Sequence, residues 1–317
     1  MKLLRGPQQR SLFNKGVVAT IGNFDGVHLG HQNLIRALKQ KAQQLNLPTV
    51  VVLFEPQPRE YFQLTIAPTR LTTLREKLDV LKALKIDYIY CIKFDKKLAH
   101  SSAEDFVDHF LCQKLNIKYL LIGADFRFGK NRGADVNCIA ELGMKRGFTV
   151  DTHCDFCLDD ERISSTKIRA LLKDNNLDLA AKLLGRPYSL CGRVMRGDGR
   201  GRQWGIPTAN LSLNRVSLPV RGVFIVKAYI PGNQISYGVA NIGSRPTVDG
   251  TKNVLEVHLL DFQDSLYGEL IQVFFLHKLR DEVKFTTIDA LLAQIHKDID
   301  AAKAFLNLNR LDLNEGM

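Results

Sequence analysis

The sequence of 317 residues lacks any apolar run long enough to cross a membrane. Its longest apolar runs, such as Val50–Phe54 and Tyr119–Ile122, are strand-sized, whereas a membrane helix needs about 20 residues. Residues 1–10 contain no apolar stretch of the kind found in a signal peptide. We therefore expect a cytoplasmic protein that does not contact a membrane.

Cysteine is also scarce, because six cysteines over this length do not form a disulfide framework. His153, Cys154 and Cys157 resemble part of a zinc site, but no second Cys-x-x-Cys pair completes four ligands, so we assign this group no role. Two nucleotide-binding motifs are missing as well. No Gly-x-Gly-x-x-Gly run follows the first predicted strand, and Gly123–Lys130 has the wrong spacing for a P-loop.

Acidic residues are nearly absent from residues 186–221, which contain seven arginines, no lysine and the single acid Asp198. The whole chain has a net charge of +11. A local excess of positive charge attracts phosphate, whether on a nucleotide or on a nucleic acid. A solvated basic face explains the charge equally well, so charge alone does not identify the partner.

The first half of the chain alternates short apolar runs with longer amphipathic ones, at a length and composition typical of two globular domains. The runs predict strands at Val17–Phe24, Val50–Phe54, Tyr88–Ile92 and Tyr119–Ile122, and helices at Gly30–Leu45, Leu71–Leu84 and Ala103–Leu115. Strands that alternate with helices predict a parallel sheet with helices packed on its faces.

The second half has a different pattern, which begins after a predicted helical connection over residues 165–184. Short strands separated by Gly, Pro, Asn and Asp are predicted at Tyr188–Met195, Gly222–Ile230, Tyr237–Ile242, Val254–Leu260 and Ile271–His277. Such strands predict an antiparallel barrel or sandwich. A closing helix follows, for which Thr286 is the predicted cap. We place the domain boundary between residues 184 and 185, which gives domains 1–184 and 185–317.

The first motif is Thr20-Ile-Gly-Asn-Phe-Asp-Gly-Val-His-Leu-Gly-His31, between a predicted strand and a predicted helix. Glycine lets the backbone approach a ligand closely, and the N-terminus of a helix favours an anion. The spacing of His28 and His31 allows both imidazoles to face the same phosphate. Helix capping and metal binding are alternative roles for the two histidines.

This stretch resembles the signature of the nucleotidyltransferase superfamily, and specifically of its prokaryotic FAD synthetase branch. Further matching strings are Phe54-Glu-Pro-Gln-Pro58, Arg70-Leu-Thr-Thr-Leu-Arg-Glu-Lys77, Gly123-Ala-Asp-Phe-Arg-Phe-Gly129 and Arg162-Ile-Ser-Ser-Thr-Lys-Ile-Arg169. Gln57 stands where many members have histidine, so we assign it no role.

The resemblance implies a set of residues that act on ATP. His28 and His31 contact the phosphates and take part in catalysis, and Asp125 lies near the nucleotide. The remaining nucleotide-binding positions lie in the first motif and in a mobile phosphate-binding loop: Gly22, Phe24, Asp25, Gly26, Gly30, Arg162, Ser165, Thr166 and Arg169. Class I aminoacyl-tRNA synthetases share the histidine motif, but residues 163–169 replace their lysine-rich loop and no anticodon-binding domain is recognisable.

The second motif is Gly192-Arg-Val-Met-Arg-Gly-Asp-Gly-Arg-Gly-Arg-Gln-Trp-Gly-Ile-Pro-Thr-Ala-Asn210. Its glycines can form a loop around phosphate, and Arg200 and Arg202 supply charge. Taken alone, an arginine–glycine stretch favours RNA. The Pro207-Thr-Ala-Asn210 string, however, resembles the riboflavin kinase domain, and the match continues through Arg221–Phe224, Asn241–Thr247, Val254–Phe262 and Leu279–Phe285.

The riboflavin kinase resemblance also implies specific roles. Thr208 and Asn210 hold Mg²⁺ and nucleotide, and Glu256 is the catalytic base, which on a strand points away from the face that carries Leu255 and Val257. The other implied cofactor-binding residues are Gly197, Arg200, Gly201, Arg202 and Arg280.

Together the two resemblances cover nearly the whole chain, in the order found in the prokaryotic bifunctional riboflavin kinase/FAD synthetase family. They imply a Rossmann-like α/β nucleotidyltransferase domain, then an antiparallel β-barrel riboflavin kinase domain with a C-terminal helix. The implied enzyme uses ATP and Mg²⁺ to convert riboflavin to FMN and then FMN to FAD, and binds no nucleic acid or membrane. Two alternatives stay open, a different nucleotidyltransferase with an unrelated barrel and an RNA-binding protein. The sequence does not give the oligomeric state.

Overall fold

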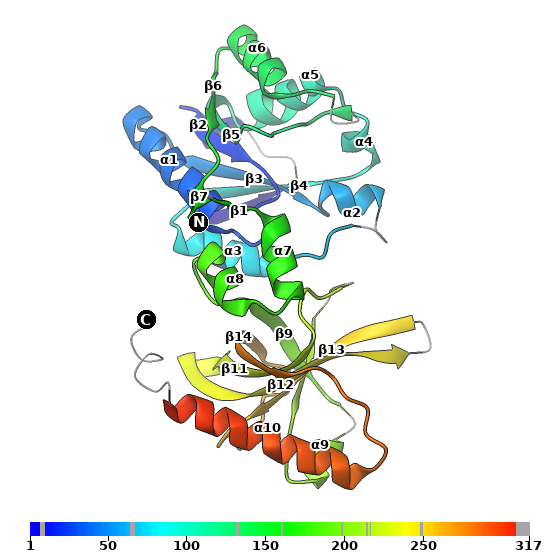
Figure 1. Ribbon diagram of the computed structural model, residues 1–317. Helices are drawn as coiled ribbons and strands as arrows, with labels where there is room; N and C mark the ends of the chain where they lie inside the picture. The colour runs from blue at the N-terminus through cyan, green and yellow to red at the C-terminus, as the bar shows by residue number, and fades with distance from the viewer. Residues whose placement is uncertain are drawn as a thin grey trace. The chain divides into compact units, whose positions relative to one another are not determined.

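The computed structural model describes residues 1–6, 10–63, 67–130, 133–159, 161–197, 199–213, 215, 217–247 and 250–308 (Figure 1). The chain forms two compact units, Met1–Ser165 and Thr166–Met317. The boundary predicted at residues 184 and 185 concerns the extent of the two functional domains, and it stays a prediction. Each unit is described here by itself.

The first unit is built on a six-stranded sheet in which every neighbouring pair of strands is parallel. In spatial order the strands are β1 (Lys2–Arg5), β4 (Tyr88–Lys93), β3 (Thr49–Glu55), β2 (Val17–Ile21), β5 (Ile117–Gly123) and β6 (Thr149–His153). The predicted parallel sheet is confirmed. The sequence analysis missed the two edge strands β1 and β6, whose residues are mostly exposed and therefore carry no apolar run.

Helices cover both faces of this sheet, and the strand residues alternate between two apolar cores. Val17, Ala19 and Ile21 of β2 belong to the core under α5 (Ala103–Phe106), the adjoining π-helical segment Val107–Lys114 and α6 (Val136–Arg146). Val18 belongs to the core under α1 (Leu29–Leu45) and α3 (Leu74–Ala83). Because successive strand residues point to opposite faces, a fully buried strand supplies both cores.

Several short elements complete the first unit. They are the 3-10 turn η1 (Arg10–Phe13), α2 (Pro58–Phe62), α4 (Lys96–Ala99) and the two-stranded sheet β7 (Cys157–Leu158) and β8 (Glu161–Arg162). The predicted helix Leu71–Leu84 begins later than expected, because Thr73 is its N-cap. Thr73 accepts the backbone N–H of Glu76, and the Glu76 carboxylate accepts the Thr73 N–H in return.

The second unit is a closed barrel of six antiparallel strands, which confirms the barrel prediction. In order around the barrel the strands are β10 (Ala209–Ser212), β13 (Gly250–Leu259), β12 (Gln234–Thr247), β11 (Gly222–Ile230), β14 (Leu270–Arg280) and β9 (Ser189–Met195). Alternate residues fill the interior, where the rings of Phe224 and Phe275 meet edge-to-face with centroids 5.3 Å apart.

The helices α7 (Ser165–Lys173, which starts at the last residue of the first unit), α8 (Leu177–Leu184), α9 (Arg200–Gln203) and α10 (Ile288–Leu308) belong to the second unit. The connection predicted over residues 165–184 is helical as expected, and it is divided into the two helices α7 and α8. Asn175 takes a left-handed conformation (φ 59°), and the side chain of Asn176 caps α8 by accepting the Leu179 N–H. Asparagine tolerates this conformation and caps helices well, which explains the break.

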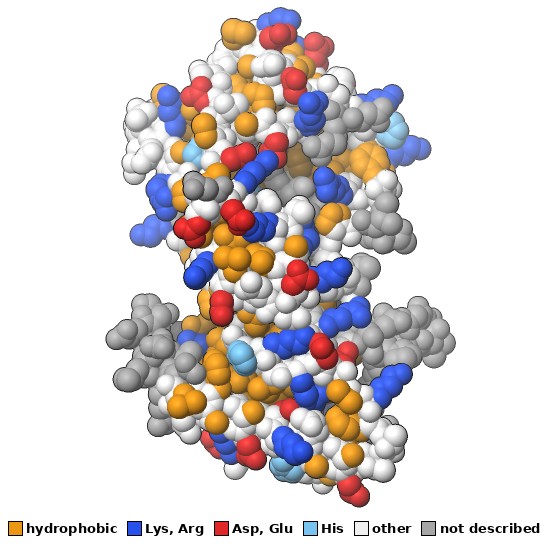
Figure 2. Space-filling view, viewed as in Figure 1, with side chains coloured by type: hydrophobic (Ala, Val, Ile, Leu, Met, Phe, Trp, Pro, Cys, Tyr) orange, Lys and Arg blue, Asp and Glu red, His pale blue; other side chains and the backbone are white. Residues whose placement is uncertain are grey.

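The closing helix α10 packs on the outside of the barrel, with Leu292, Ile295 and Ile299 against Val223 and Val239. Its predicted cap is off by one residue, because the hydroxyl of Thr287, and not of Thr286, accepts the Ala290 N–H at 3.2 Å. On the face drawn in Figure 2, lysine and arginine side chains are interspersed with acidic ones.

Candidate active sites

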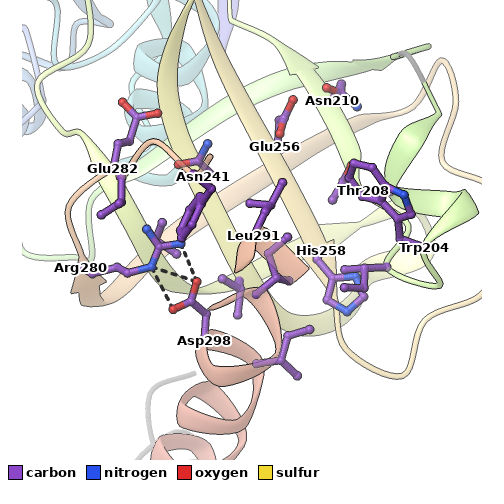
Figure 3. A pocket seen from close by; sticks show the side chains of 18 of the residues that line it. Trp204, Thr208, Asn210, Asn241, Glu256, His258, Arg280, Glu282, Leu291 and Asp298 are labelled. Carbon is purple, nitrogen blue, oxygen red and sulfur yellow. Dashed lines mark hydrogen bonds and ion pairs between the residues drawn. The ribbon is translucent and has the colours of Figure 1, made fainter. Parts of the chain in front are cut away.

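A cavity of about 330 Å³ lies between the outer face of the barrel and α10, and we call it the barrel cavity (Figure 3). The sequence-predicted residues that line it are Gly201, Thr208, Asn210, Glu256 and Arg280. The structure thus gathers residues from four separate segments around one hollow. The rest of its wall is largely apolar, with Trp204, Phe285 and Leu291 among its members.

Three polar side chains form a row across adjacent strands in this wall. Glu256 on β13 is paired with Asn210 on β10 and with Asn241 on β12. Directly paired residues on neighbouring strands project to the same face of a sheet. Leu255 and Val257 are buried in the barrel interior, so Glu256 points outward into the cavity, between the two amides. Sequence reasoning missed Asn241, although it stands in one of the strings that resemble riboflavin kinase.

The glycine loop before β10 approaches this row closely. A Cβ atom on Gly197 would lie 2.5 Å from Asn210 Nδ2, and one on Gly201 would lie 2.4 Å from the carbonyl oxygen of Ile206. Both positions therefore require glycine for lack of space. The short helix α9 (Arg200–Gln203) carries the two predicted phosphate-binding arginines, whose side chains lie outside the described part of the structure, as does Asp198.

His258 is a cavity residue that sequence reasoning missed. Its Nδ1 lies 2.9 Å from the carbonyl oxygen of Pro207, and because a carbonyl can only accept, Nδ1 carries the proton. The hydrogen bond ties β13 to the Pro-Thr-Ala-Asn segment. Its spacing in the sequence could have identified it, because a residue two positions after Glu256 on a strand lies on the same face as Glu256.

Arg280 is engaged with the wall of the same cavity. Its guanidinium binds the carboxylate of Asp298 through Nε–Oδ1 at 3.0 Å and Nη2–Oδ2 at 2.7 Å. Asp298 is 5% exposed and also accepts a hydrogen bond from Gln294 Nε2 at 2.9 Å. The ion pair joins β14 to α10. No local pattern identified Asp298, because only the packing of the helix on the barrel brings it to Arg280.

A second cavity of about 470 Å³ adjoins the first, and we call it the adjoining cavity. Its wall contains Val194, Val257, Leu259 and the loop residues 262–267. Thr208 lines both cavities. Thr208 therefore lies where the two cavities meet.

The first unit places the two predicted histidines at the N-terminus of α1. Nδ1 of His28 accepts the backbone N–H of His31 at 3.3 Å, so this nitrogen is unprotonated and a neutral His28 carries its proton on Nε2. The two imidazole rings are stacked, with centroids 3.7 Å apart. Burial, together with the neighbouring His28 and Lys77, holds the pKa of His31 well below its ordinary value. His31 is therefore a neutral hydrogen-bonding group near pH 7.

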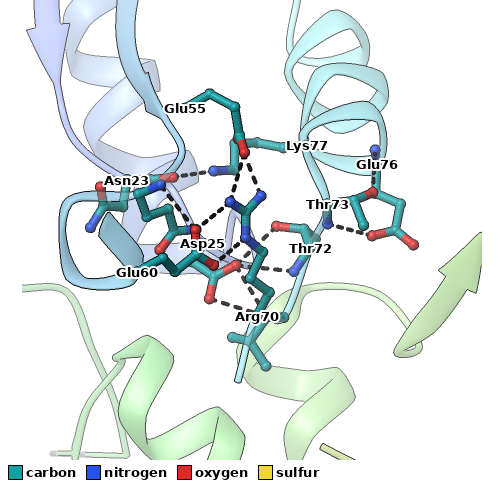
Figure 4. A network of polar contacts seen from close by, with 11 residues as sticks. Asn23, Asp25, Glu55, Glu60, Arg70, Thr72, Thr73, Glu76 and Lys77 are labelled. Atoms are coloured by element: carbon teal, nitrogen blue, oxygen red, sulfur yellow. Dashed lines mark hydrogen bonds and ion pairs between the residues drawn. The ribbon is translucent and has the colours of Figure 1, made fainter. Parts of the chain in front are cut away.

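The backbone from Gly22 to His28, which we call the histidine turn, leads from β2 into these rings. Asp25 within it is 3% exposed, and its carboxylate accepts the backbone N–H groups of Leu71 and Thr72 at 3.0–3.1 Å (Figure 4). The hydroxyl of Ser165 donates to the carbonyl of Asp25 at 2.8 Å. Two residues predicted to bind nucleotide thus interact through the turn itself.

Other predicted nucleotide-binding residues are placed as follows. Arg162 on β8 pairs with Asp125 (Nη2–Oδ2 2.7 Å) and with Asp155 (Nε–Oδ1 3.1 Å), and all three side chains are exposed. Asp125 follows the carboxyl end of β5, the strand beside β2. Thr166 and Arg169 lie on α7, in the second unit.

The structure describes all three possible zinc ligands, His153, Cys154 and Cys157. His153 Nε2 lies 2.7 Å from Asn33 Oδ1, and Cys154 and Cys157 are exposed. Among the residues that the structure describes, no group of three or more possible metal ligands is gathered.

An exposed aromatic cluster was also missed by sequence reasoning. Phe62, 60% exposed, and Tyr61 on α2 meet Phe94, which follows β4, with ring centroids 5.4–5.7 Å apart. Phe54 on β3 contacts Phe94 at 5.9 Å. The carboxyl ends of β3 and β2 are neighbours in the sheet, the edge at which α/β proteins bind ligands. The signal was present as an aromatic-rich stretch after the second predicted strand.

Comparison with known proteins agrees with this architecture. The FAD synthetase family matches residues 11–167, and the riboflavin kinase family matches residues 184–306. Bifunctional riboflavin kinase/FMN adenylyltransferases from Haemophilus influenzae and Escherichia coli K12 are 47% and 46% identical, over 97% and 98% of this chain and 100% and 99% of their own lengths. A solved structure described as a macrolide-efflux protein from Streptococcus pneumoniae superposes with a TM-score of 0.77 at 30% identity, over 93% of this chain and 97% of that one.

Fold and sites together define a two-domain enzyme of flavin nucleotide synthesis. No helix in the described residues is both long and apolar enough to span a membrane. The chain belongs to the bifunctional riboflavin kinase/FMN adenylyltransferase family. It has both activities, producing FMN from riboflavin and FAD from FMN at the expense of ATP.

Proposed function

We propose that riboflavin binds in the barrel cavity and ATP in the adjoining cavity, with Thr208 where they meet. The observation that carries this assignment is the row of Asn210, Glu256 and Asn241, which puts one carboxylate between two amides in the barrel cavity. The apolar wall from Trp204 and α10 suits a planar tricyclic ring, as is usual for cofactor sites.

Glu256 is the catalytic base in this proposal. It accepts the proton of the ribityl 5′-hydroxyl while that oxygen attacks the γ-phosphorus of ATP, and the bond to the bridging oxygen breaks to release ADP. The two amides orient the carboxylate and the hydroxyl. His258 keeps the Pro-Thr-Ala-Asn segment in place through Pro207, and Arg280 with Asp298 keeps α10 over the cavity. The glycine loop, with Gly197, Arg200, Gly201 and Arg202, surrounds the phosphates.

The residues present fit Mg²⁺. Thr208 and Asn210 offer a hydroxyl and an amide oxygen in one cavity wall, and Mg²⁺ prefers few protein oxygens, with phosphate and water as its other ligands. Thr208 and Asn210 would hold the ion. When bound, it neutralises charge on the phosphates.

The first unit transfers the adenylyl group. The Nε2–H of His28, and His31 beside it, donate hydrogen bonds to ATP phosphates at the N-terminus of α1, where the helix dipole adds positive potential. A phosphate oxygen of FMN attacks the α-phosphorus and pyrophosphate leaves. Asp125 and Arg162 lie near the nucleotide, and the exposed rings of Tyr61 and Phe62 stack on the isoalloxazine ring of FMN.

The remaining positions of the first site shape the binding surface. Gly22, Phe24, Gly26 and Gly30 shape the backbone around the phosphates, and Ser165 adds a hydroxyl beside the turn. The assignment of Thr166 and Arg169 to nucleotide binding stays a prediction. At Gly30 a Cβ would lie 3.1 Å from His28 Nδ1, so glycine keeps that ring in position. We assign adenylyl transfer to residues 1–184 and phosphorylation to residues 185–317, both in the cytoplasm and without nucleic acid.

The assignment is tested by incubating the protein with riboflavin, ATP and Mg²⁺ and separating the flavins by chromatography. We expect FMN first and FAD afterwards. Glu256→Gln forms neither flavin from riboflavin but still converts supplied FMN to FAD. If that variant phosphorylates riboflavin at the wild-type rate, the proposed base is wrong. An RNA-binding protein would instead show RNA affinity that falls steeply with salt.

A further inference from the structure

The histidine turn has an unfavourable backbone conformation. Phe24, Gly26 and Val27 all have positive φ angles, of 46°, 84° and 42°. Glycine adopts this region freely, whereas a bulky or β-branched residue such as Phe24 or Val27 does so only under constraint. Residues keep such a conformation only where contacts with the surrounding structure hold them in it, and they cluster at functional sites. Some other part of the first unit must therefore hold the turn.

The segment of residues 71–77, at the start of α3, provides that constraint at Asn23, Asp25 and Gly26 (Figure 4). The ammonium group of Lys77 donates to the carbonyl oxygen of Asn23. The carboxylate of Asp25 accepts the N–H groups of Leu71 and Thr72, and the Thr72 hydroxyl accepts the Gly26 N–H at 2.9 Å. These hydrogen bonds span 46 to 54 residues of sequence, so they connect separate elements.

Lys77 is an unusual residue for a structural role alone. It is 1% exposed, and burial lowers its pKa although the carboxylates of Asp25 and Glu55 act in the opposite direction. Arg70 and Cys91 also act on Lys77, and its charge in turn acts on His31. Burying a charge is costly, and an apolar side chain of similar size often stabilises a fold as well. The position of this charge beside the turn calls for a functional explanation.

We infer that Lys77 and Asp25 are positioning residues for adenylyl transfer, which pin the strained turn onto α3 and thereby aim the stacked imidazoles of His28 and His31. Neither side chain contacts the substrate in this role. The inference rests on the function proposed for the two histidines.

The charge of Lys77 also affects the pKa of His31. This effect distinguishes a role in positioning the site from a role in general stability. The positive charge of Lys77 lowers the pKa of His31, together with burial and His28. Removing the charge raises that pKa, so more of His31 is protonated in weak acid. The acid limb of the pH profile for adenylyl transfer therefore moves to higher pH in Lys77→Met.

The experiment compares Lys77→Met and Asp25→Asn with a matched control, Asp87→Asn, in the full chain. Asp87 accepts the N–H and hydroxyl of Thr49 at the amino end of β3, at 2.9 Å and 2.7 Å, so its loss weakens the same sheet away from the turn. Circular dichroism of each variant reports whether the first unit is folded, and kinase activity reports whether the second unit is intact. Adenylyl transfer is measured with supplied FMN, which makes it independent of the kinase.

We expect Lys77→Met and Asp25→Asn to lose about 100-fold in kcat for FAD formation, the scale of a misplacement near 1 Å. Riboflavin phosphorylation stays at the wild-type rate, and Asp87→Asn loses stability but keeps adenylyl transfer. The inference is overturned if Lys77→Met retains full activity with an unshifted acid limb while His28→Ala with His31→Ala is inactive. If the double histidine variant is itself active, the proposed function fails instead.

Discussion

Asn210 and Glu256 face each other directly across the antiparallel pair β10 and β13. They are 46 residues apart in sequence, and their pairing places the proposed metal ligand beside the proposed base. Asn241 occupies the corresponding position on the other side of Glu256, on β12. Because strand register sets this row, a change that shifts the register disrupts base, amides and ion together.

Replacing Glu256 by Gln keeps the shape of the side chain and removes the base. We expect riboflavin phosphorylation to fall by about 10²-fold or more, the usual contribution of general-base catalysis, with FMN adenylylation nearly unchanged. Separate assays with riboflavin and with FMN measure the two rates. Glu269→Gln, an exposed acid of the same unit outside both cavities, serves as the control. Comparable loss of both activities in a folded Glu256→Gln protein contradicts the assignment.

The double substitution His28→Ala with His31→Ala should abolish adenylyl transfer and leave riboflavin phosphorylation intact. The ATP phosphates lose two hydrogen-bond donors in the transition state, so FMN accumulates and little FAD forms. Chromatography of the flavins after incubation with riboflavin and ATP measures this. FAD synthesis from supplied FMN at an undiminished rate would show that the motif has another role.

Protonation of His31 couples the stability of the first unit to pH. Its pKa is lowered by folding, so the unfolded chain binds more protons and stability is lost as pH falls below about 6.5. The slope from one group is at most about 1.4 kcal/mol per pH unit. His31→Gln removes this part of the slope, whereas His153, whose pKa burial also lowers, contributes equally to both proteins.

Urea unfolding followed at several pH values measures this difference. Circular dichroism reports both units, while fluorescence of Trp204, the sole tryptophan of the sequence, reports the barrel unit. Equal slopes for His31→Gln and wild type would argue that His31 keeps its ordinary pKa in the folded protein.

Two fragments test the domain assignment. Residues 185–317 contain all six barrel strands and α10, so we expect this fragment to fold and to phosphorylate riboflavin. Residues 166–317 add α7 and α8, and α8 packs against β14, so the longer fragment has the higher free energy of unfolding. Thermal unfolding and flavin turnover of both fragments provide the comparison. A folded short fragment without kinase activity would show that the site needs residues before 185.

The last prediction concerns the stereochemistry of adenylyl transfer. The described residues around the histidine turn contain no nucleophile–base–orienter arrangement, and the phosphate of FMN is already an ionised nucleophile. Direct in-line displacement inverts the configuration at the α-phosphorus. ATP with a chiral α-phosphorothioate reports this in the FAD analogue. Retention would require two displacements through an adenylyl-enzyme.

The amino-acid sequence by itself determined the class of fold and, through its resemblances, the two activities. Strand–helix alternation in the first half and short turn-bounded strands in the second depend on local periodicity, which a single sequence contains. The same holds for Glu256, whose direction follows from strand alternation with Leu255 and Val257. Even the error in the cap of α10 was a local one, with Thr286 predicted in place of Thr287.

Tertiary structure alone decided which distant residues meet. The bonds from Lys77 to Asn23 and from Asp25 to Thr72, and the ion pair of Arg280 with Asp298, join elements that no periodic pattern relates. The packing of α3 beside the histidine turn, and of α10 on the barrel, determines which of these residues become partners. Buried charges need such partners because an unpaired charge is too costly away from water, and only the folded chain shows where each partner lies.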